Sequence, residues 1–346
     1  MKILIRTDAT PAIGMGHLSR CLTLAAQLRA RGAELEFLMV EPSPVVAEKV
    51  AAAGAGLHPL PGGLDLPQDL ELTRQRVARG KAGGAVLDGY QFDQAYLDGL
   101  GRVLPLLFFD ELAEFDFTCA LVLNQNHHAG ELAYRAAPGT RLLLGPGYAV
   151  LRPEFPAARP AARVHPDQAQ RVFLNFGGSD PHDLTSRALA GLAASPSRYQ
   201  IRAVLGGENR HAPRVRELAA ASPHQVEVLE NLSDMTGVMN WADLALSASG
   251  TNTTLEMSCL GLPMVLVIQA ENQRLIGEFM GRQGLARQLG FWSQVDGAAL
   301  ATGLESLAAD PVARGEMSQR LQMAVDGQGA GRVAQALLAV CAGGGA

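Results

Sequence analysis

Short apolar runs alternate with longer amphipathic stretches along the chain. The runs, such as Met264–Ile268, are continuously apolar, which is typical of strands covered on both faces of a parallel sheet. The strands predicted in the first series are Lys2–Arg6, Glu34–Val40, Gly56–Leu60, Ala85–Leu87, Leu104–Phe109, Ala120–Leu123 and Arg141–Leu144. The helices predicted between them are His17–Arg31, Ser43–Ala53, Leu66–Arg79 and Phe92–Leu100. This alternation predicts an α/β fold with a doubly wound parallel sheet.

A proline-rich segment then interrupts the pattern. It carries Pro146, Pro153, Pro156, Pro160 and Pro166, and such a density of proline indicates a linker. A second series follows, with strands near Arg171–Phe176, Gln200–Leu205, Val226–Leu229, Leu244–Ser247 and Met264–Ile268. Its helices lie near Asp183–Ala193, Ala212–Ala220, Met235–Trp241, Thr251–Leu260 and Gln273–Arg282, and a helical tail runs from about Ala298 to Val340.

The chain is therefore expected to fold into two Rossmann-like domains. The N-terminal domain takes residues 1–147, the linker 148–166, and the C-terminal domain with its helical tail 167–346. Ligands of doubly wound folds bind at the carboxyl ends of the strands, so we expect the two domains to face a cleft that holds the site.

Composition narrows the choice of function. The net charge of -5 argues against a nucleic-acid partner, which calls for a basic face. No apolar stretch approaches the roughly 20 residues of a membrane span, and the N-terminus lacks a signal-peptide pattern. Four scattered cysteines form no CxxC pair, so neither a zinc site nor a disulfide framework is predicted. We expect a cytoplasmic protein whose oligomeric state is open, with a monomer favoured.

The first chemical motif is Gly14-Met15-Gly16-His17, which follows the first strand and opens a helix. Glycine lets the backbone approach a ligand closely, and a helix N-terminus offers free N–H groups to phosphate. The positive helix end also disfavours imidazolium, which would keep His17 neutral and able to accept a proton. The alternative is that His17 is a polar cap that contacts a phosphate or no ligand at all. A third glycine of GxGxxG is missing, which argues against a nicotinamide site.

The second motif is a glycine-rich loop after the strand Arg171–Phe176, formed by Gly177, Gly178 and Ser179. A tight turn that caps the next helix would use the same residues. Its place at the carboxyl end of a strand favours a ligand loop.

A third run, SASGTNTTLE, contains small hydroxylated residues at the start of a helix and ends on Glu256. Ser249, Gly250, Thr251 and Thr254 could present donors to phosphate, and Glu256 could accept the two ribose hydroxyls or belong to a capping box. The chain contains no P-loop motif and no DxD pair, and no lysine follows Lys81. We therefore expect a diphosphate to be held by backbone and hydroxyl donors without metal or cofactor.

Three further segments are weaker. Asp88-Gly89-Tyr90 follows a strand and either places a phenol at the site or forms an ordinary turn. Asn272-Gln273 opens a helix, where Asn272 could serve only as an N-cap. His127-His128 has no ligand partner at metal spacing and is interpreted as a solvated loop.

Taken together, the motifs resemble one family. The motif GxGHxxR is met by Gly14, Gly16, His17 and Arg20, DxY by Asp88 and Tyr90, and FDExA by Asp110 and Glu111. The runs LNQN, GPGYAVLRPEF, FGGSDP and ENQ follow in the family's order. The chain resembles the UDP-2,4-diacetamido-2,4,6-trideoxy-β-L-altropyranose hydrolase (PseG) family of pseudaminic acid biosynthesis, a relative of MurG-like glycosyltransferases with the GT-B fold.

The resemblance implies removal of UDP from a diacetamido-trideoxy sugar by inverting, metal-independent cleavage of the anomeric C–O bond. By motif, His17 would activate water or assist the leaving group, and Tyr90 and Asn272 would position sugar and nucleophile. Ser249, Gly250 and Thr251 would meet the diphosphate, and Glu256 the ribose. Two alternatives stay open: a MurG-like glycosyltransferase using a UDP-amino sugar for surface polysaccharide or flagellin glycosylation, and a nucleotide-sugar-binding protein without turnover.

Overall fold

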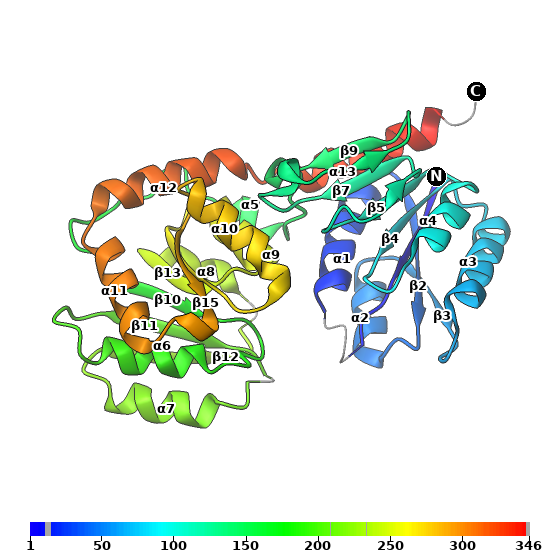
Figure 1. Ribbon diagram of the computed structural model, residues 1–346. Helices are drawn as coiled ribbons and strands as arrows, with labels where there is room; N and C mark the ends of the chain where they lie inside the picture. The colour runs from blue at the N-terminus through cyan, green and yellow to red at the C-terminus, as the bar shows by residue number, and fades with distance from the viewer. Residues whose placement is uncertain (11–14, 208, 233, 344–346) are drawn as a thin grey trace. The chain divides into compact units, whose positions relative to one another are not determined.

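The computed structural model describes residues 1–10, 15–207, 209–232 and 234–343, which form two compact units. Unit 1 comprises Met1–Pro153 and the segment that begins at Gln328, and unit 2 comprises Glu154–Gly327. Each unit contains a parallel sheet with helices on its faces (Figure 1). The predicted pair of Rossmann-like α/β domains is confirmed.

The sheet of unit 1 has seven strands in the order β3-β2-β1-β4-β5-β7-β9. The strands are β1 (Lys2–Thr7), β2 (Glu34–Val40), β3 (Gly56–Leu60), β4 (Gly84–Asp88), β5 (Leu106–Phe109), β7 (Leu121–Asn124) and β9 (Arg141–Leu144). The helices are α1 (Gly16–Arg29), α2 (Pro44–Ala52), α3 (Leu66–Gly80), α4 (Gln94–Gly101) and α13 (Gly329–Gly343). A separate two-stranded sheet pairs β6 (Asp116–Phe117) with β8 (Arg135–Ala136).

The sheet of unit 2 has six strands in the order β12-β11-β10-β13-β14-β15. The strands are β10 (Arg171–Asn175), β11 (Gln200–Leu205), β12 (Gln225–Glu230), β13 (Leu244–Ala248), β14 (Met264–Ile268) and β15 (Arg287–Phe291). The helices are α5 (Glu154–Ala158), α6 (Leu184–Leu192), α7 (Ala212–Ala221), α8 (Met235–Trp241), α9 (Thr251–Cys259), α10 (Arg274–Arg282), α11 (Gly297–Ala308) and α12 (Pro311–Ala324).

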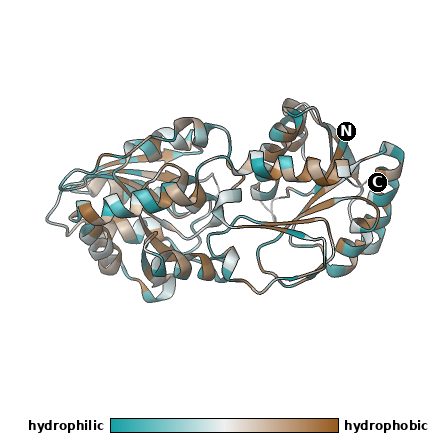
Figure 2. Ribbon diagram, turned by 90° about the horizontal axis from the view of Figure 1, so that it is seen from above, coloured by the Kyte–Doolittle hydropathy of each residue, from teal (hydrophilic) through white to brown (hydrophobic). Residues whose placement is uncertain are grey.

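Continuous apolar strands form these sheets because both of their faces are covered. All five residues of β4, β13 and β14 are buried, as expected for central parallel strands. Figure 2 shows hydrophobic residues on the strands, whereas the helices carry hydrophilic residues on part of their surface. In unit 1 the strands after β1 are added first on one side of it (β2, β3) and then on the other (β4, β5), and in unit 2 the same change of side occurs at β10. Such switch points open a crevice at the carboxyl end of the sheet.

Only the first part of the predicted helical tail, α11 and α12, belongs to unit 2, and the assignment of its last part to that domain was wrong. Its last helix, α13, packs against α1 and belongs to unit 1. Val333 and Leu337 of α13 share a hydrophobic core with Leu18 and Leu24 of α1. Burial of these apolar side chains accounts for the return of the chain to the first unit, since it removes α13's hydrophobic stripe from water.

The predicted linker at 148–166 also differs from the structure. The units divide between Pro153 and Glu154, and the chain after this point is fastened to unit 2. The Arg159 guanidinium donates to the carbonyl of Gln322 at 2.9 Å, and the amide of Gln322 donates to the carbonyl of Pro160 at 2.8 Å. The guanidinium of Arg163 donates to the Met239 carbonyl at 3.2 Å. The prolines therefore mark an ordered strap and not a free linker.

Candidate active site

His17 is the second residue of α1 and lies beside the end of β4. Its Nδ1 is 2.6 Å from Oδ1 of Asp88, the last residue of that strand. The two meet because β1 pairs in parallel with β4, with Thr7 opposite Asp88, and α1 follows β1 along the chain. The His17 side chain is 8% exposed and that of Asp88 is completely buried. The predicted residues His17 and Asp88 therefore form a histidine–carboxylate pair.

Arg20, one turn after His17, keeps the Asp88 carboxylate charged. Its Nε donates to Asp88 Oδ2 at 2.7 Å and its Nη2 to Oδ1 at 2.6 Å. Burial opposes ionisation of Asp88, but the charge and hydrogen bonds of Arg20, together with His17, lower the carboxyl pKa to about 2. Asp88 is thus an anion at any physiological pH.

This anion fixes the tautomer of His17. Nδ1 of His17 also lies 3.0 Å from Nη2 of Arg20. A single ring nitrogen can either donate a hydrogen bond to the carboxylate or accept one from the guanidinium, but it cannot do both. The shorter, charge-assisted contact is the one to Asp88, so we assign the proton to Nδ1. In the neutral ring Nε2 then carries the lone pair and can accept a proton, which is the arrangement of a general base.

Tyr90 and Glu111 complete the cluster. The rings of His17 and Tyr90 meet edge to face with centroids 4.9 Å apart. The Tyr90 hydroxyl donates to Glu111 Oε2 at 2.6 Å, and Nη1 of Arg20 donates to Glu111 Oε1 at 2.8 Å. Desolvation and the negative charge of Glu111 raise the pKa of the Tyr90 phenol. One guanidinium therefore joins both carboxylates of the cluster.

A small cavity of about 80 Å³ opens beside these residues. Its polar lining includes His17, Arg20, Tyr90 and Glu111. The rest of its wall is mostly aromatic and apolar: Phe92, Phe108, Phe109, Leu112 and Phe115. An apolar wall strengthens electrostatic interactions at the polar groups because it keeps water away from them.

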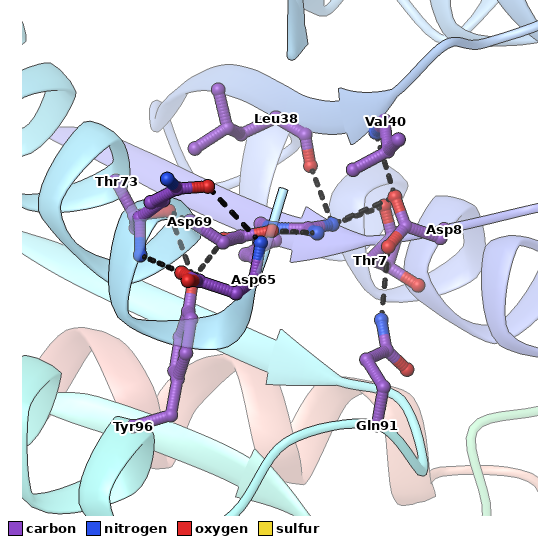
Figure 3. A network of polar contacts seen from close by, with 11 residues as sticks. Thr7, Asp8, Leu38, Val40, Asp65, Asp69, Thr73, Gln91 and Tyr96 are labelled. Carbon is purple, nitrogen blue, oxygen red and sulfur yellow. Dashed lines mark hydrogen bonds and ion pairs between the residues drawn. The ribbon is translucent and has the colours of Figure 1, made fainter. Parts of the chain in front are cut away.

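A second network fixes the loops around this cluster (Figure 3). Asp8, directly after β1, accepts the backbone N–H of Val40 at 2.7 Å and the side-chain amide of Gln91 at 2.9 Å. It also pairs with Arg6 at 2.7 Å, which in turn pairs with Asp69 of α3 at 2.6 Å. Asp8 therefore connects the carboxyl ends of β1 and β2 with the loop that carries Tyr90.

The glycine-rich loop of unit 2 leaves β10 at the switch point of its sheet. Gly177 has a φ of +84°, a conformation that favours glycine, and Gly178 and Ser179 are exposed. A Cβ on Gly206, after β11, would collide with the backbone of Gly178, so the two loops touch. Asp180 is buried and accepts the backbone N–H groups of Leu184 and Thr185, both at 2.9 Å, at the start of α6. The loop is both a turn that caps α6 and an open backbone surface.

The run before α9 matches the prediction only in part. Gly250 is the N-cap of α9 and Thr251 its first residue, and the cap makes no side-chain hydrogen bond. Ser249 and Thr254 are wrong as ligand-binding side chains, because both are fully buried. The Ser249 hydroxyl donates to the carbonyl of Val267 at 3.2 Å, and the Thr254 hydroxyl to that of Gly250 at 2.9 Å. Both hydroxyls satisfy backbone carbonyls instead.

The remaining predicted residues of unit 2 lie in α9 and in the loop at the carboxyl end of β14. Asn272 is exposed in a short 3₁₀ helix, Glu271–Gln273, that follows β14. Oε1 of Gln273 accepts the backbone N–H of Gln269 at 3.1 Å, and a Cβ on Gly250 would lie 4.0 Å from Nε2 of Gln273. Glu256, in α9, is half-buried. The loops after β13 and β14 therefore adjoin, with Gly250 beside Gln273.

The structure brings His17, Arg20, Asp88 and Tyr90 together in unit 1. Gly16 is the exposed first residue of α1, and Gly14 lies outside the described residues. The role of Asn272 in positioning the sugar and nucleophile, and the cleft between the domains, stay predictions.

The sequence interpretation missed the roles of Glu111 and Asp8. Glu111 lies in the FDExA motif, but the motif does not show that its carboxylate joins Arg20 to Tyr90. The interpretation of His127 and His128 as a solvated loop is wrong, since each is only 5% exposed. Burial lowers the pKa of His127 to about 4, so its ring is neutral.

Within residues 1–10, 15–207, 209–232 and 234–343, no cluster of three or more His, Cys, Asp or Glu side chains could hold a metal ion. In the same described part of the chain, no helix is both long and apolar enough to cross a bilayer.

Comparison with known proteins relates unit 2 to a glycosyltransferase family. Residues 172–324 match the model of the glycosyltransferase family 28 C-terminal domain. The spore coat polysaccharide biosynthesis protein SpsG of Bacillus subtilis is 30% identical over 196 residues, which are 56% of this chain and 57% of that protein. An uncharacterized protein of Methanocaldococcus jannaschii is 25% identical over 283 residues, 79% of this chain and 57% of that protein. The chain thus spans 57% of the length of both relatives.

The fold of the whole chain is that of the GT-B glycosyltransferases. The crystal structure of Acinetobacter baumannii MurG matches with a TM-score of 0.74 at 15% identity, over 98% of this chain and 99% of that one. The structure of LpCGTa in complex with UDP matches with a TM-score of 0.64 at 15% identity, and that of the glycosyltransferase VinC in complex with dTDP with a TM-score of 0.63 at 14% identity. The predicted GT-B fold, which this chain shares with MurG, is therefore confirmed. These similarities agree better with the glycosyltransferase alternative than with the hydrolase, which stays a prediction.

Proposed function

We propose that this protein transfers a sugar from a nucleotide sugar to an acceptor hydroxyl, with His17 as the general base. The observation that carries the proposal is the pairing of His17 with the buried Asp88 anion, which leaves Nε2 of His17 free to accept a proton. The match of unit 2 to the family 28 domain and the similarity to the polysaccharide biosynthesis protein SpsG support transfer of a sugar.

The proposed step balances without a cofactor. The acceptor proton moves to Nε2 of His17 while the acceptor oxygen forms a bond to the anomeric carbon. The bond from that carbon to the diphosphate oxygen breaks, and its electron pair leaves with the nucleoside diphosphate. The configuration at the anomeric carbon is inverted. Asp88 stabilises the imidazolium that forms, because its carboxylate accepts a charge-assisted hydrogen bond from Nδ1–H.

Unit 2 is proposed to hold the nucleotide through neutral donors. Gly177, Gly178 and Ser179 would meet the phosphates from the exposed loop after β10. The N–H groups at Gly250 and Thr251 would add the N-terminus of α9, since the cap makes no side-chain hydrogen bond there. Glu256 would accept the ribose hydroxyls, and Asn272 and Gln273 would contact the sugar. The similar folds of LpCGTa and VinC, solved with UDP and dTDP, support a pyrimidine nucleotide.

Hydrolysis of the same bond is the second candidate. It is favoured by the motifs GHxxR and DxY, which the structure joins in one cluster of His17, Arg20, Asp88 and Tyr90. Only the nucleophile differs, since water would replace the acceptor hydroxyl and the diacetamido sugar would be released from UDP.

One assay separates the two candidates. The full chain is incubated with UDP-N-acetylglucosamine, a UDP-2,4-diacetamido-2,4,6-trideoxyhexose and other UDP- and dTDP-activated hexosamines, with and without a panel of sugar acceptors, and free nucleotide is measured. Transfer predicts release that requires an acceptor, and hydrolysis predicts the same release without one. Both predict full activity in EDTA; loss of activity in EDTA that added metal restores would reject a metal-independent mechanism. No release from any sugar nucleotide would reject both candidates.

A further inference from the structure

Glu111 lies where it controls the hydroxyl of Tyr90. It follows β5 in the chain, and its side chain is only 16% exposed. Both of its oxygens are used: Oε1 accepts Nη1 of Arg20 at 2.8 Å, and Oε2 accepts the Tyr90 hydroxyl at 2.6 Å. Arg20 in turn is held by Asp88 through two hydrogen bonds. The Glu111 carboxylate is therefore fixed in place on the side away from Tyr90.

The direction of the Tyr90 hydrogen bond follows from its partner. A carboxylate paired with a guanidinium can only accept hydrogen bonds, so the single phenolic proton points to Glu111. The Tyr90 oxygen then has only lone pairs left for any other group. The residue is 64% exposed, its ring lies against His17 and both line the same cavity, so a molecule bound beside the imidazole lies next to Tyr90.

We propose that Glu111 makes Tyr90 a hydrogen-bond acceptor for the substrate, so that the substrate group next to His17 must be an O–H or N–H donor. This inference rests on the proposed function for the existence of a sugar substrate at His17. Glu111 is then a positioning residue that acts through Tyr90. Tyr90 selects for a hydroxyl or amide N–H at this point and does not supply a proton to the leaving group.

The first test needs no ligand. The phenolate absorbance of the full chain is titrated with pH in the wild type and in Tyr90→Phe, and their difference is the titration of Tyr90. The same difference is measured in the backgrounds Glu111→Gln and Glu114→Gln. We expect Glu111→Gln to move the Tyr90 titration to lower pH by about one unit or more, because a charged acceptor is lost. Glu114→Gln, which removes a carboxylate from the same cavity wall, is the matched control and should leave it in place.

The contrary results are equally clear. An unchanged Tyr90 titration in Glu111→Gln, or an equal shift in Glu114→Gln, would show that Glu111 does not hold the phenolic proton. Circular dichroism and the urea midpoint of each variant check that the fold is retained.

The second test concerns the substrate. The sugar nucleotide that reacts in the assay above is compared with its singly deoxyfluorinated analogues, in which a hydroxyl donor becomes a weak acceptor, and with the analogue in which an O-acetyl group replaces the acetamido group and removes its N–H donor. We expect one analogue to lose about tenfold or more in kcat/KM with the wild type and to lose no more than a few-fold with Tyr90→Phe. Equal penalties for every analogue in both proteins would overturn the donor assignment. Failure of all sugar nucleotides to react would reject the proposed function and the donor assignment, while the titration would still decide the role of Glu111.

Discussion

The two sheets end in different chemistry at their carboxyl edges. In unit 1 this edge carries paired charges: Arg20 of α1 lies between Asp88, the last residue of β4, and Glu111 after β5, and Arg6 of β1 lies between Asp8 and Asp69 of α3. In unit 2 the exposed residues Gly177–Ser179 after β10, and Gly250 and Thr251 after β13, present glycines, backbone N–H groups and hydroxyls, whereas Asp180 is buried and turned to the start of α6. We call this the neutral edge and the edge of unit 1 the charged edge. No lysine follows Lys81 in the sequence, so none is present to bind phosphate at the neutral edge.

This contrast fits a division of the proposed reaction. Transfer of a proton needs a base whose tautomer and charge are controlled, and buried ion pairs provide that control. Release of a nucleoside diphosphate needs donors that hold the leaving group without a fixed cation, and helix N-termini with exposed glycine loops provide them. The predictions below test whether the charged edge carries the chemistry and the neutral edge the binding.

The largest effect is expected for His17→Ala. Removal of the base should lower kcat by about 10²-fold or more. The affinity for UDP, measured by calorimetry, should change little because the nucleotide is assigned to unit 2. His58→Ala, on the outer strand β3, is the control and should keep normal turnover. Near-normal turnover of His17→Ala would remove the base from the mechanism, and a parallel loss of UDP affinity would place the nucleotide at the charged edge.

The second prediction concerns the acid stability that Asp88 contributes. Its pKa is lowered from 3.8 to about 2 in the fold, so the charged carboxylate stabilises the protein above about pH 4, and this contribution is lost as the pH falls through about 2. The contribution is about 2 kcal/mol. As the pH is lowered from 7, the free energy of unfolding of Asp88→Asn should therefore fall by about this amount less than that of the wild type. Urea titration at each pH measures it.

The exposed Asp167→Asn provides the control for this measurement. It should follow the wild-type pH dependence. An acid profile of Asp88→Asn that coincides with the wild type would mean that Asp88 is not held as an anion by Arg20.

The sequence was sufficient to predict strands that are apolar throughout and less informative elsewhere. β4 and β14 follow from their apolar runs alone. β15 was not predicted because its sequence, RQLGF, is half polar, and all five of its residues are only partly buried. The placement of α13 could not be predicted, since an amphipathic pattern shows that a helix has a buried face but not which core receives it.

The candidate site shows the same limit. His17 and Asp88 were both chosen from local motifs, but their contact depends on the pairing of β1 with β4, which are separated in the chain by β2 and β3. Ser249 and Thr254 were wrong because residue type does not show whether a hydroxyl faces a ligand or a backbone carbonyl of its own unit. The role of Glu111 depends on its hydrogen bonds to Arg20 and Tyr90, which the sequence does not show.

The third prediction tests the neutral edge. Thr251→Asp places a negative charge at the first residue of α9, where it favours the helix itself and repels a bound diphosphate. The Kd for UDP should rise by about tenfold, while binding of uridine, which lacks phosphate, should stay the same. Ala194→Asp, an exposed position between α6 and β11, adds the same charge away from this edge and should have no effect. If both variants weaken UDP equally, the effect is one of net charge, and α9 is not the phosphate site.

The smallest effect is expected for Gln91, which does not contact the His17 cluster but holds the loop that carries Tyr90. Gln91→Leu keeps the size of the side chain but removes the hydrogen bond to Asp8 that connects the Tyr90 loop to β1. Because Gln91 is exposed and the bond is single, kcat should fall only about two- to fivefold, with the affinity for UDP unchanged. Gln75→Leu removes an exposed hydrogen bond to Glu71 within α3 and should leave kcat as it is. A fall in kcat that is equal in the two variants would assign the effect to general stability; a fall confined to Gln91→Leu would show that the Asp8 network helps to set the distance between Tyr90 and His17.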